Sequence, residues 1–301
     1  MMAMTSGDAA RRPILLSTDC GVDMDDQWAI VHLALIPDIE ILGLLTSHAP
    51  NLPSPAARES ARIAGTVFDA IGAATRPPIY AGSDGPLDGL TPIRNDGVDF
   101  LVEQSRKFDR GNRLPVLVLG AATDVASALL LDPSLSERIE IVAMAFDGWP
   151  EGHDGFNVRN DVTAWDVILR SGADVTCGDA ASTIRHLALS VAEAERLFGE
   201  YGELGHYLVE LLRDWLVRND WMAKDVTGDP ASWPVWDQVV VAHLLGLTRW
   251  QTYPRPDIRP GPEFVHDRPA AANPTINWID FIDSNRLWQD LRERLALWCS
   301  R

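Results

Sequence analysis

Four carboxylates lie within eight residues near the N-terminus, at Asp19, Asp23, Asp25 and Asp26. They directly follow an apolar run, residues 14–18, which predicts a buried strand. In open α/β sheets, ligands collect at the carboxyl ends of strands, which is where these acids fall. Like charges this close together repel, and a bound cation or a shared proton relieves the repulsion. Hard divalent cations such as Ca²⁺ prefer oxygen ligands, so the cluster indicates a cation site.

A second interpretation of the same acids is that they only cap a helix and face water. This interpretation fits Asp23 better than Asp19. Asp25 and Asp26 come just before the predicted helix 28–35, where carboxylates favour the first turn. Gly21 permits a tight turn. The spacing excludes two other sites. A haloacid-dehalogenase-type phosphatase has its second Asp at the position of Gly21, and the run lacks the twelfth-position Glu of an EF-hand.

The acids must be positioned by an alternation of buried strands and amphipathic helices. The predicted strands cover residues 14–18, 39–47, 77–82, 114–120 and 139–146. The predicted helices cover residues 28–35, 56–71, 101–107, 124–131, 239–247 and 287–298, with a further helical pattern over 190–216. The pattern predicts the α/β class: one large domain with a mostly parallel, Rossmann-like central sheet, helices on both faces and a helical C-terminal part.

Two segments fall outside this alternation. Residues 255–274 contain five prolines and little periodicity, which predicts an ordered loop over the body of the domain. Residues 1–12 are short, polar and rich in small side chains, so we expect a flexible N-terminus and neither a secretory signal nor a membrane span.

The charge balance is strongly acidic, with 26 Lys and Arg against 43 Asp and Glu and a formal net charge of −17. Such a surface repels phosphate backbones and anionic membranes, and no basic stripe offsets it, so we expect neither as a partner. The three cysteines, Cys20, Cys177 and Cys299, are far apart and form no paired metal or redox motif. This usage is typical of a reducing compartment, and we expect a cytoplasmic protein.

The acidic run at residues 19–26 resembles the amino-terminal signature of the inosine–uridine-type nucleoside hydrolases, Asp-x-Asp-Pro-Gly-x-Asp-Asp, with a longer loop before the double Asp. Three further stretches resemble family segments in the same order: residues 78–82 (Pro-Val-x-x-Gly), 119–126 (Gly-Pro-Leu-Thr-Asn-x-Ala) and 156–161 (Phe-Asn-x-x-x-Asp). The resemblance covers residues 13–245 and implies one catalytic domain over residues 13–301. It also implies a homodimer or homotetramer.

The resemblance implies hydrolysis of the N-glycosidic bond of a ribonucleoside, or a related ribosyl compound, to ribose and free base with one Ca²⁺. Asp19 would be both a metal ligand and the general base that activates a Ca²⁺-bound water. The other implied metal ligands are Asp26, the main-chain carbonyl of Leu119 and Asp237. The implied ribose contacts are Asp25, Asn51 and Asn157.

The sequence departs from the family at two positions. Many members have His immediately before the last ligand Asp, as the acid for the leaving base, and this chain has Trp236, whose indole N–H has no useful acidity. The family's Glu for the ribose 5′ hydroxyl is Gly155 here, and we expect Asp154 to reach the same space. Loop histidines that could supply an acid instead are His48, His153 and His266.

These departures keep other hypotheses open. The chain could be a non-catalytic nucleoside- or ribose-binding protein on the same scaffold, or a hydrolase whose leaving group needs no protonation. Individual residues have simpler interpretations as well: Asp237 as a helix cap, Asn51 as a turn residue, and Thr123 with Asp124 as caps of the helix over 124–131.

Overall fold

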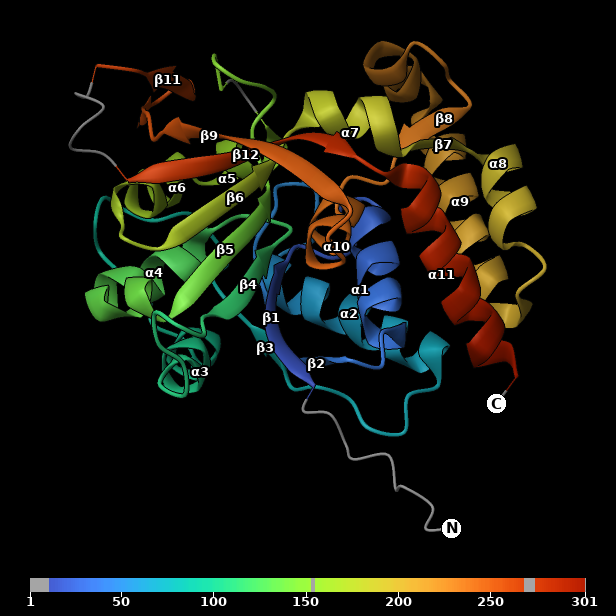
Figure 1. The fold of residues 1–301 in the computed structure, drawn as a ribbon, viewed down its shortest axis with the longest axis horizontal. Helices are drawn as coiled ribbons and strands as arrows, with labels where there is room; N and C mark the ends of the chain where they lie inside the picture. The colour runs from blue at the N-terminus through green and yellow to red at the C-terminus, as the bar shows by residue number, and fades with distance from the viewer. Residues whose placement is uncertain (1–10, 153–154, 268–273, 301) are drawn as a thin grey trace, which may run out of the picture.

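A sheet of eight strands runs through the molecule (Figure 1). The structure is a computed structural model that describes residues 11–152, 155–267 and 274–300. Its strands are β1 (Arg12–Thr18), β2 (Ile39–Thr46), β3 (Ile79–Ala81), β4 (Leu114–Val118), β5 (Ile139–Met144), β6 (Asp174–Gly178), β7 (Ala188–Ser190), β8 (Ser232–Pro234), β9 (Thr248–Pro254), β10 (Asp257–Arg259), β11 (Glu263–Val265) and β12 (Thr275–Ile282). The central order is β3-β2-β1-β4-β5-β6-β12-β9, and only β9 runs antiparallel to its neighbour.

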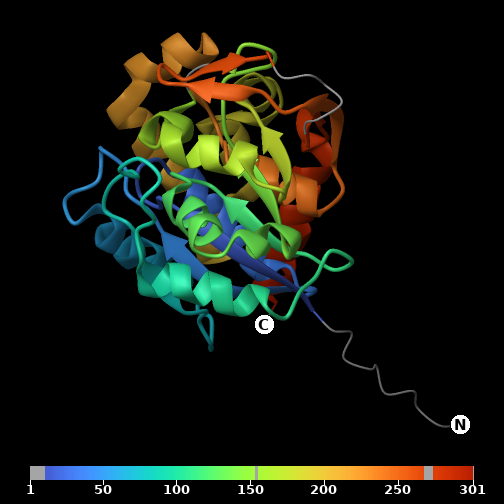
Figure 2. The same ribbon diagram turned by 90° about the vertical axis from the view of Figure 1, so that its left-hand side faces the viewer.

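Helices cover both faces of this sheet. They are α1 (Asp25–Leu35), α2 (Ala56–Ile71), α3 (Asp96–Ser105), α4 (Thr123–Leu131), the 3₁₀ turn η1 (Pro133–Glu137), α5 (Phe156–Asn160), α6 (Val162–Arg170), α7 (Ala180–Leu187), α8 (Val191–Phe198), α9 (Gly202–Thr227), α10 (Gln238–Leu244) and α11 (Ser284–Cys299). One buried cluster joins α1, α2, α9, α10 and α11 to the sheet, and a second joins α3, α4 and α6 to its other face. Figure 2 is turned so that the second layer faces the viewer. The predicted fold class is confirmed.

The strand order reverses between β1 and β4, which makes this pair the switch point of the sheet. β1 leads into α1 on one face and β4 leads into α4 on the other, so the chain diverges at the carboxyl ends of these strands. A crevice at such a point is where open α/β sheets bind ligands. Asp19 follows β1 and Leu119 follows β4, so the fold places both at this crevice.

The central strands form where the sequence is continuously apolar. All five residues of β4 are buried, and so are Ile14 to Thr18 of β1. When helices cover both faces of a parallel sheet, the side chains on both sides of each central strand are buried. Apolar and polar residues therefore do not alternate along these strands.

Other elements differ from the prediction. Residues 255–274, predicted as a loop, contain the β10–β11 ribbon, although residues 268–273 lie outside the described part. β1 begins at Arg12, the last residue of the predicted flexible N-terminus, and residues 1–10 are not described. Helix α9 continues to Thr227, beyond the predicted end at residue 216. Strands β6, β9 and β12 were not predicted.

Within the described ranges, no helix combines the length and the apolar character that crossing a membrane requires.

Candidate active site

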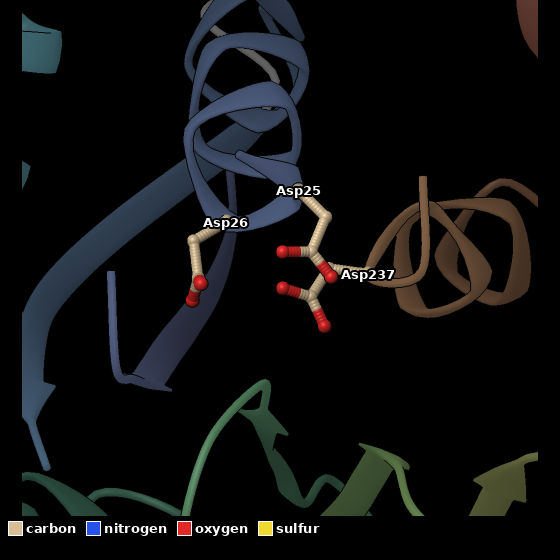
Figure 3. Close-up of side chains that lie close together, drawn as sticks. All are labelled: Asp25, Asp26 and Asp237. Carbon is tan, nitrogen blue, oxygen red and sulfur yellow. The ribbon is translucent and has the colours of Figure 1, made fainter. Parts of the chain in front are cut away.

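Three buried carboxylates point toward one another at the crevice: those of Asp25, Asp26 and Asp237 (Figure 3). One oxygen from each lies within 4.8 Å of the others. Asp25 and Asp26 are the first two residues of α1, and Asp237 directly precedes α10. Because α1 packs against α10, segments more than 200 residues apart in the chain deliver their acids to one point.

Asp237 is not a helix cap. It occupies the position before α10 but makes no capping hydrogen bond, and neither carboxyl oxygen has a partner among the described residues. An isolated buried carboxylate is costly unless a cation or a donor compensates it. The side chain instead faces the acids at the start of α1 (Figure 3). The interpretation of Asp237 as an ordinary cap is therefore wrong.

Asp19 and Asp26 lie beside the carboxyl end of β1. The Thr18 hydroxyl donates a hydrogen bond to Asp26, and Asp19 is 3% exposed with Oδ2 unpaired in the part of the chain that the structure describes. Asp19 lies outside the tight group of three but lines the same cavity. The group of three thus contains the two predicted ligands Asp26 and Asp237 together with Asp25, which was predicted as a ribose contact.

Burial dominates the electrostatics of the cluster. Burial, with the neighbouring charge of Asp25 added, raises the pKa of Asp19 to about 8, and burial raises the pKa of Asp25 to about 7. The pKa values of Asp26 and Asp237 are raised well above their ordinary value by burial and then by the adjacent carboxylates. Such a set favours a hard divalent cation, because one ion removes the repulsion and satisfies the orphaned oxygens. The residues present fit a metal ion.

A cavity of about 600 Å³ opens beside the cluster. Its wall contains acids from the start of α1 and the turn before it, and apolar and aromatic side chains from α9 and the segment around β8. Among its lining residues are the sequence-predicted Asp19, Asp25, Asp26, Asn51, Leu119, Asn157 and Trp236. Asp154 lies outside the described residues. The structure thus gathers the predicted residues that it describes around one space, with Asp237 immediately behind it.

Asn157 is anchored to two strand ends. Its Nδ2 donates to the Leu119 carbonyl at 2.5 Å and to the Met144 carbonyl at 3.1 Å. Asn157 belongs to α5, so this pair of hydrogen bonds fixes α5 against the ends of β4 and β5.

The departure at Gly155 has a steric cause. A Cβ at this position would lie 2.6 Å from the backbone nitrogen of Phe146, closer than real Cβ atoms come to another atom. Phe146 itself has a φ of 68°, an uncommon value for a residue with a side chain. A side chain at this position, including the Glu expected from the resemblance, is therefore incompatible with the present backbone.

Among the described residues that line the cavity there is no histidine. His48 lies 3.1 Å from the Thr123 hydroxyl, and His266 lies 2.7 Å from the Pro150 carbonyl. His153 is not described. The loop histidines that the structure describes therefore offer no acid at the cavity wall.

Thr123 and Asp124 do not cap α4, contrary to the prediction. Thr123 is the first residue of the helix, and its hydroxyl donates to Asp161 at 2.7 Å. Asp124 accepts hydrogen bonds from Ser83 and Asn95. Both side chains turn away from their own helix into a buried network behind the cavity. In the sequence, only the position of Asp161 in the Phe-Asn-x-x-x-Asp stretch points to this network.

Asp23 is another residue whose role the sequence did not reveal. It does not face water as a cap: it lines the cavity, and its carboxyl accepts a hydrogen bond from Trp233 Nε1 at 2.5 Å. Trp233 in turn lies beside Trp215 of α9, with ring centroids 5.4 Å apart. The high Trp content of residues 215–236 was the available signal.

The profile of the family described as inosine-uridine preferring nucleoside hydrolase matches residues 14–288. The chain belongs to this family. It is therefore a hydrolase that acts on N-glycosyl compounds, as the sequence resemblance implied, and the interpretation as a non-catalytic binding protein is set aside.

Relatives agree with this assignment. Probable uridine nucleosidase 2 from Arabidopsis thaliana is 27% identical over 235 residues, which cover 69% of this chain and 70% of that protein. Uridine nucleosidase 1 from the same plant is 26% identical over 251 residues, covering 73% and 72%.

Solved structures share the fold. A plant nucleoside hydrolase superposes with a TM-score of 0.77 at 18% identity, covering 95% of this chain and 99% of that one. A purine-preferring ribonucleoside hydrolase from Gardnerella vaginalis gives a TM-score of 0.77 at 19% identity, with 96% and 99% covered.

Proposed function

We propose that the enzyme hydrolyses the N-glycosidic bond of a ribonucleoside with Ca²⁺ held by Asp19, Asp26, Asp237 and the Leu119 carbonyl. The observation that carries the proposal is Asp237, buried with both carboxyl oxygens unpaired in the described structure and facing Asp25 and Asp26. Because two relatives are named uridine nucleosidases, uridine is the first substrate to test.

When bound, the cation supplies the positive charge that lowers the pKa of a nearby water and orients the ribose hydroxyls. Asp19 then takes the proton of the water that attacks the anomeric carbon. Asp25, Asn51 and Asn157 hold the sugar in place, so that the attack occurs within one preassembled site. The transition state carries positive charge on the ribose ring, which the surrounding carboxylates stabilise.

The base departs toward Trp236, which lines the cavity and offers a hydrogen-bond donor but no acid. The metal-binding part of the site is therefore retained in this proposal, whereas protonation of the leaving base does not come from the position that serves it in many family members.

The test is release of free ribose from a panel of uridine, cytidine, inosine, adenosine and guanosine. Metal-free enzyme should be inactive, and Ca²⁺ should restore activity better than Mg²⁺. Asp19→Asn should lower kcat by about 100- to 10,000-fold, as for loss of a general base, while the exposed control Asp214→Asn should not. Ca²⁺ binding without ribose release from any nucleoside would contradict the hydrolytic proposal, and full activity in EDTA would contradict the metal.

We also propose that the protein is cytoplasmic, supported by its three free cysteines, and that it forms a homodimer or homotetramer, supported by two exposed apolar side chains on α9, Val217 at 77% and Trp221 at 63%. Light scattering on the purified protein measures the assembly directly, and a monomer at micromolar concentration would refute it.

A further inference from the structure

Asp23 connects two parts of the cavity wall, the turn before α1 and the segment around β8, which are 210 residues apart in the chain. It lies in the turn between β1 and α1, where Gly21 adopts a φ of 105° and the Val22 amide donates to the Asp19 carbonyl at 3.3 Å. One carboxyl oxygen of Asp23 accepts from the Met24 amide at 2.6 Å, and the other accepts from Trp233 Nε1 at 2.5 Å. The turn that presents Asp19 to the substrate therefore also presents Asp23 to the indole.

Three indoles lie close together in the wall of the cavity that the acids also line. Trp233 is 3% exposed and lies between Trp215 and Trp236, with ring centroids 5.4 Å and 5.6 Å away. All three line the cavity, together with Met222 and Val226 of α9. A space lined by both carboxylates and indoles matches a molecule with a polyhydroxylated sugar and a planar base.

The indole of Trp233 needs a partner to keep one orientation. Its N–H is the only polar group on the ring, and a hydrogen bond to a carboxylate is stronger and shorter than one to a neutral acceptor. Trp236 packs edge-on against Trp233, with an angle of 84° between the two ring planes. The carboxylate that orients Trp233 therefore also affects the neighbouring indole of the wall.

We propose that Asp23 is a positioning residue for base recognition: its carboxylate fixes the Trp233 indole in the wall against which the nucleobase packs. The inference rests on the proposed function, because it takes the substrate to be a ribonucleoside. It adds a determinant of base binding that is separate from the acids that hold the metal and the sugar.

The test is a double-mutant cycle on Asp23→Ala and Trp233→Phe. Phe keeps an aromatic face and removes the indole N–H, so both single variants delete the same hydrogen bond. Each should raise KM for uridine about tenfold, within the range for base stacking on an aromatic side chain, with little change in kcat. The double variant should be no worse than either single one, because the two changes remove one shared interaction.

A binding measurement separates this role from a structural one. In equilibrium dialysis of the Ca²⁺-loaded enzyme, Asp23→Ala should weaken uracil and adenine binding and leave ribose binding unchanged. Asp23→Asn keeps an acceptor oxygen and should retain near-normal KM. The control Asp214→Ala, an exposed acid on α9 next to Trp215, should match the unmodified enzyme.

Additive effects of the two single variants would overturn the proposal, and so would a loss of kcat or of ribose binding equal to the loss of base binding. If Asp23→Ala does not fold, Trp233→Phe and Asp23→Asn decide the question with the same readouts. Base binding can be measured without turnover. A failure to release ribose would therefore contradict the proposed function and leave the proposal for Asp23 to be decided by the binding data.

Discussion

At the scale of single residues, the direction of the Asp237 side chain follows from its neighbours across the crevice and not from its position at the start of α10. It precedes α10, where an acid ordinarily caps backbone amides, yet it turns toward Asp25 and Asp26. Three buried carboxylates in this arrangement should destabilise the metal-free protein, and on the proposed function we expect them to bind a cation strongly.

Asp237→Asn should therefore separate metal binding from folding. We expect the Kd for Ca²⁺ to rise by more than about 100-fold, the upper range for loss of a residue that merely supports a ligand. The metal-free variant should be more stable than metal-free native enzyme, because one repelling charge is gone. Calorimetric titration and thermal melting in EDTA measure the two effects.

The matched control is Asp124→Asn, a buried acid outside the cluster that accepts hydrogen bonds from Ser83 and Asn95. It should keep normal Ca²⁺ affinity. Equal losses of affinity in the two variants would mean that Asp237 acts only through the stability of the fold.

Trp236 gives a second residue-scale prediction. Without an acid at this position, the rate should depend steeply on the pKa of the leaving group, since general acid catalysis contributes about 100- to 10,000-fold where it operates. A nitrophenyl riboside, whose leaving group needs no proton, should be hydrolysed much faster than uridine. Measuring kcat across ribosides of graded leaving-group pKa tests this, and a flat profile would show that another acid acts.

At the scale of elements, a buried chain of hydrogen bonds connects the loops that carry the predicted sugar contacts. His48 contacts the Thr123 hydroxyl, which donates to Asp161, and Asp161 also accepts from the backbone amides of Leu87 and Ala164. His48 is on the loop after β2 that bears Asn51. Asp161 separates α5, which bears Asn157, from α6. The network therefore links the two segments that bear the asparagines.

Thr123→Val should break this chain while keeping the size of the side chain. We expect a loss of about 1–3 kcal/mol in the free energy of unfolding, because the buried Asp161 loses a donor. KM should rise more than kcat falls, since Asn51 loses its fixed position. Urea unfolding and steady-state kinetics measure both. The control is Thr66→Val on the exposed face of α2, and an unchanged KM in Thr123→Val would disprove the link to Asn51.

The same scale shows which elements the sequence could predict. Strands β1, β2, β4 and β5 read as apolar runs because helices bury both their faces. Strand β9 lies at the sheet edge with mostly exposed residues, and β12, its partner, mixes Asn and Asp with apolar residues. The pairing of β12 with β9 on one side and with β6 on the other depends on tertiary contacts, which no local pattern encodes.

The site could be predicted as far as residue identity and spacing reach. The acids, Asn51, Asn157 and Trp236 follow from motifs, and the structure gathers them at one cavity. Side-chain direction could not be predicted. Asp25 and Asp26 are adjacent in sequence yet both face Asp237, and Asp23 and Thr123 turn from expected caps to partners in distant elements.

At the scale of the whole molecule, we expect the buried acids to couple global stability to pH and, on the proposed function, to Ca²⁺. The pKa values of Asp25, about 7, and Asp19, about 8, lie above the ordinary carboxyl value. When the folded pKa is higher than the unfolded one, the unfolded chain releases its protons first as the pH rises. The metal-free fold is therefore favoured at low pH and is progressively destabilised through this window.

We accordingly expect the free energy of unfolding of the metal-free enzyme to fall as the pH rises from about 4 to about 8, with little further loss from these groups above that range. Saturating Ca²⁺ binds the ionised carboxylates and should reverse the trend. Urea unfolding at several pH values, with EDTA or with Ca²⁺, measures both curves. Stability of the metal-free enzyme that increases through this window would show that the acids are not the dominant titrating groups.

The close approach of Gly155 to the Phe146 backbone bears on how this enzyme could be redesigned. A glutamate at this position would require the main chain after β5 to take a new path. The substitution Gly155→Glu alone should therefore distort the cavity wall and add no hydrogen bond to the sugar. Grafting experiments at this corner must therefore exchange both backbone segments together.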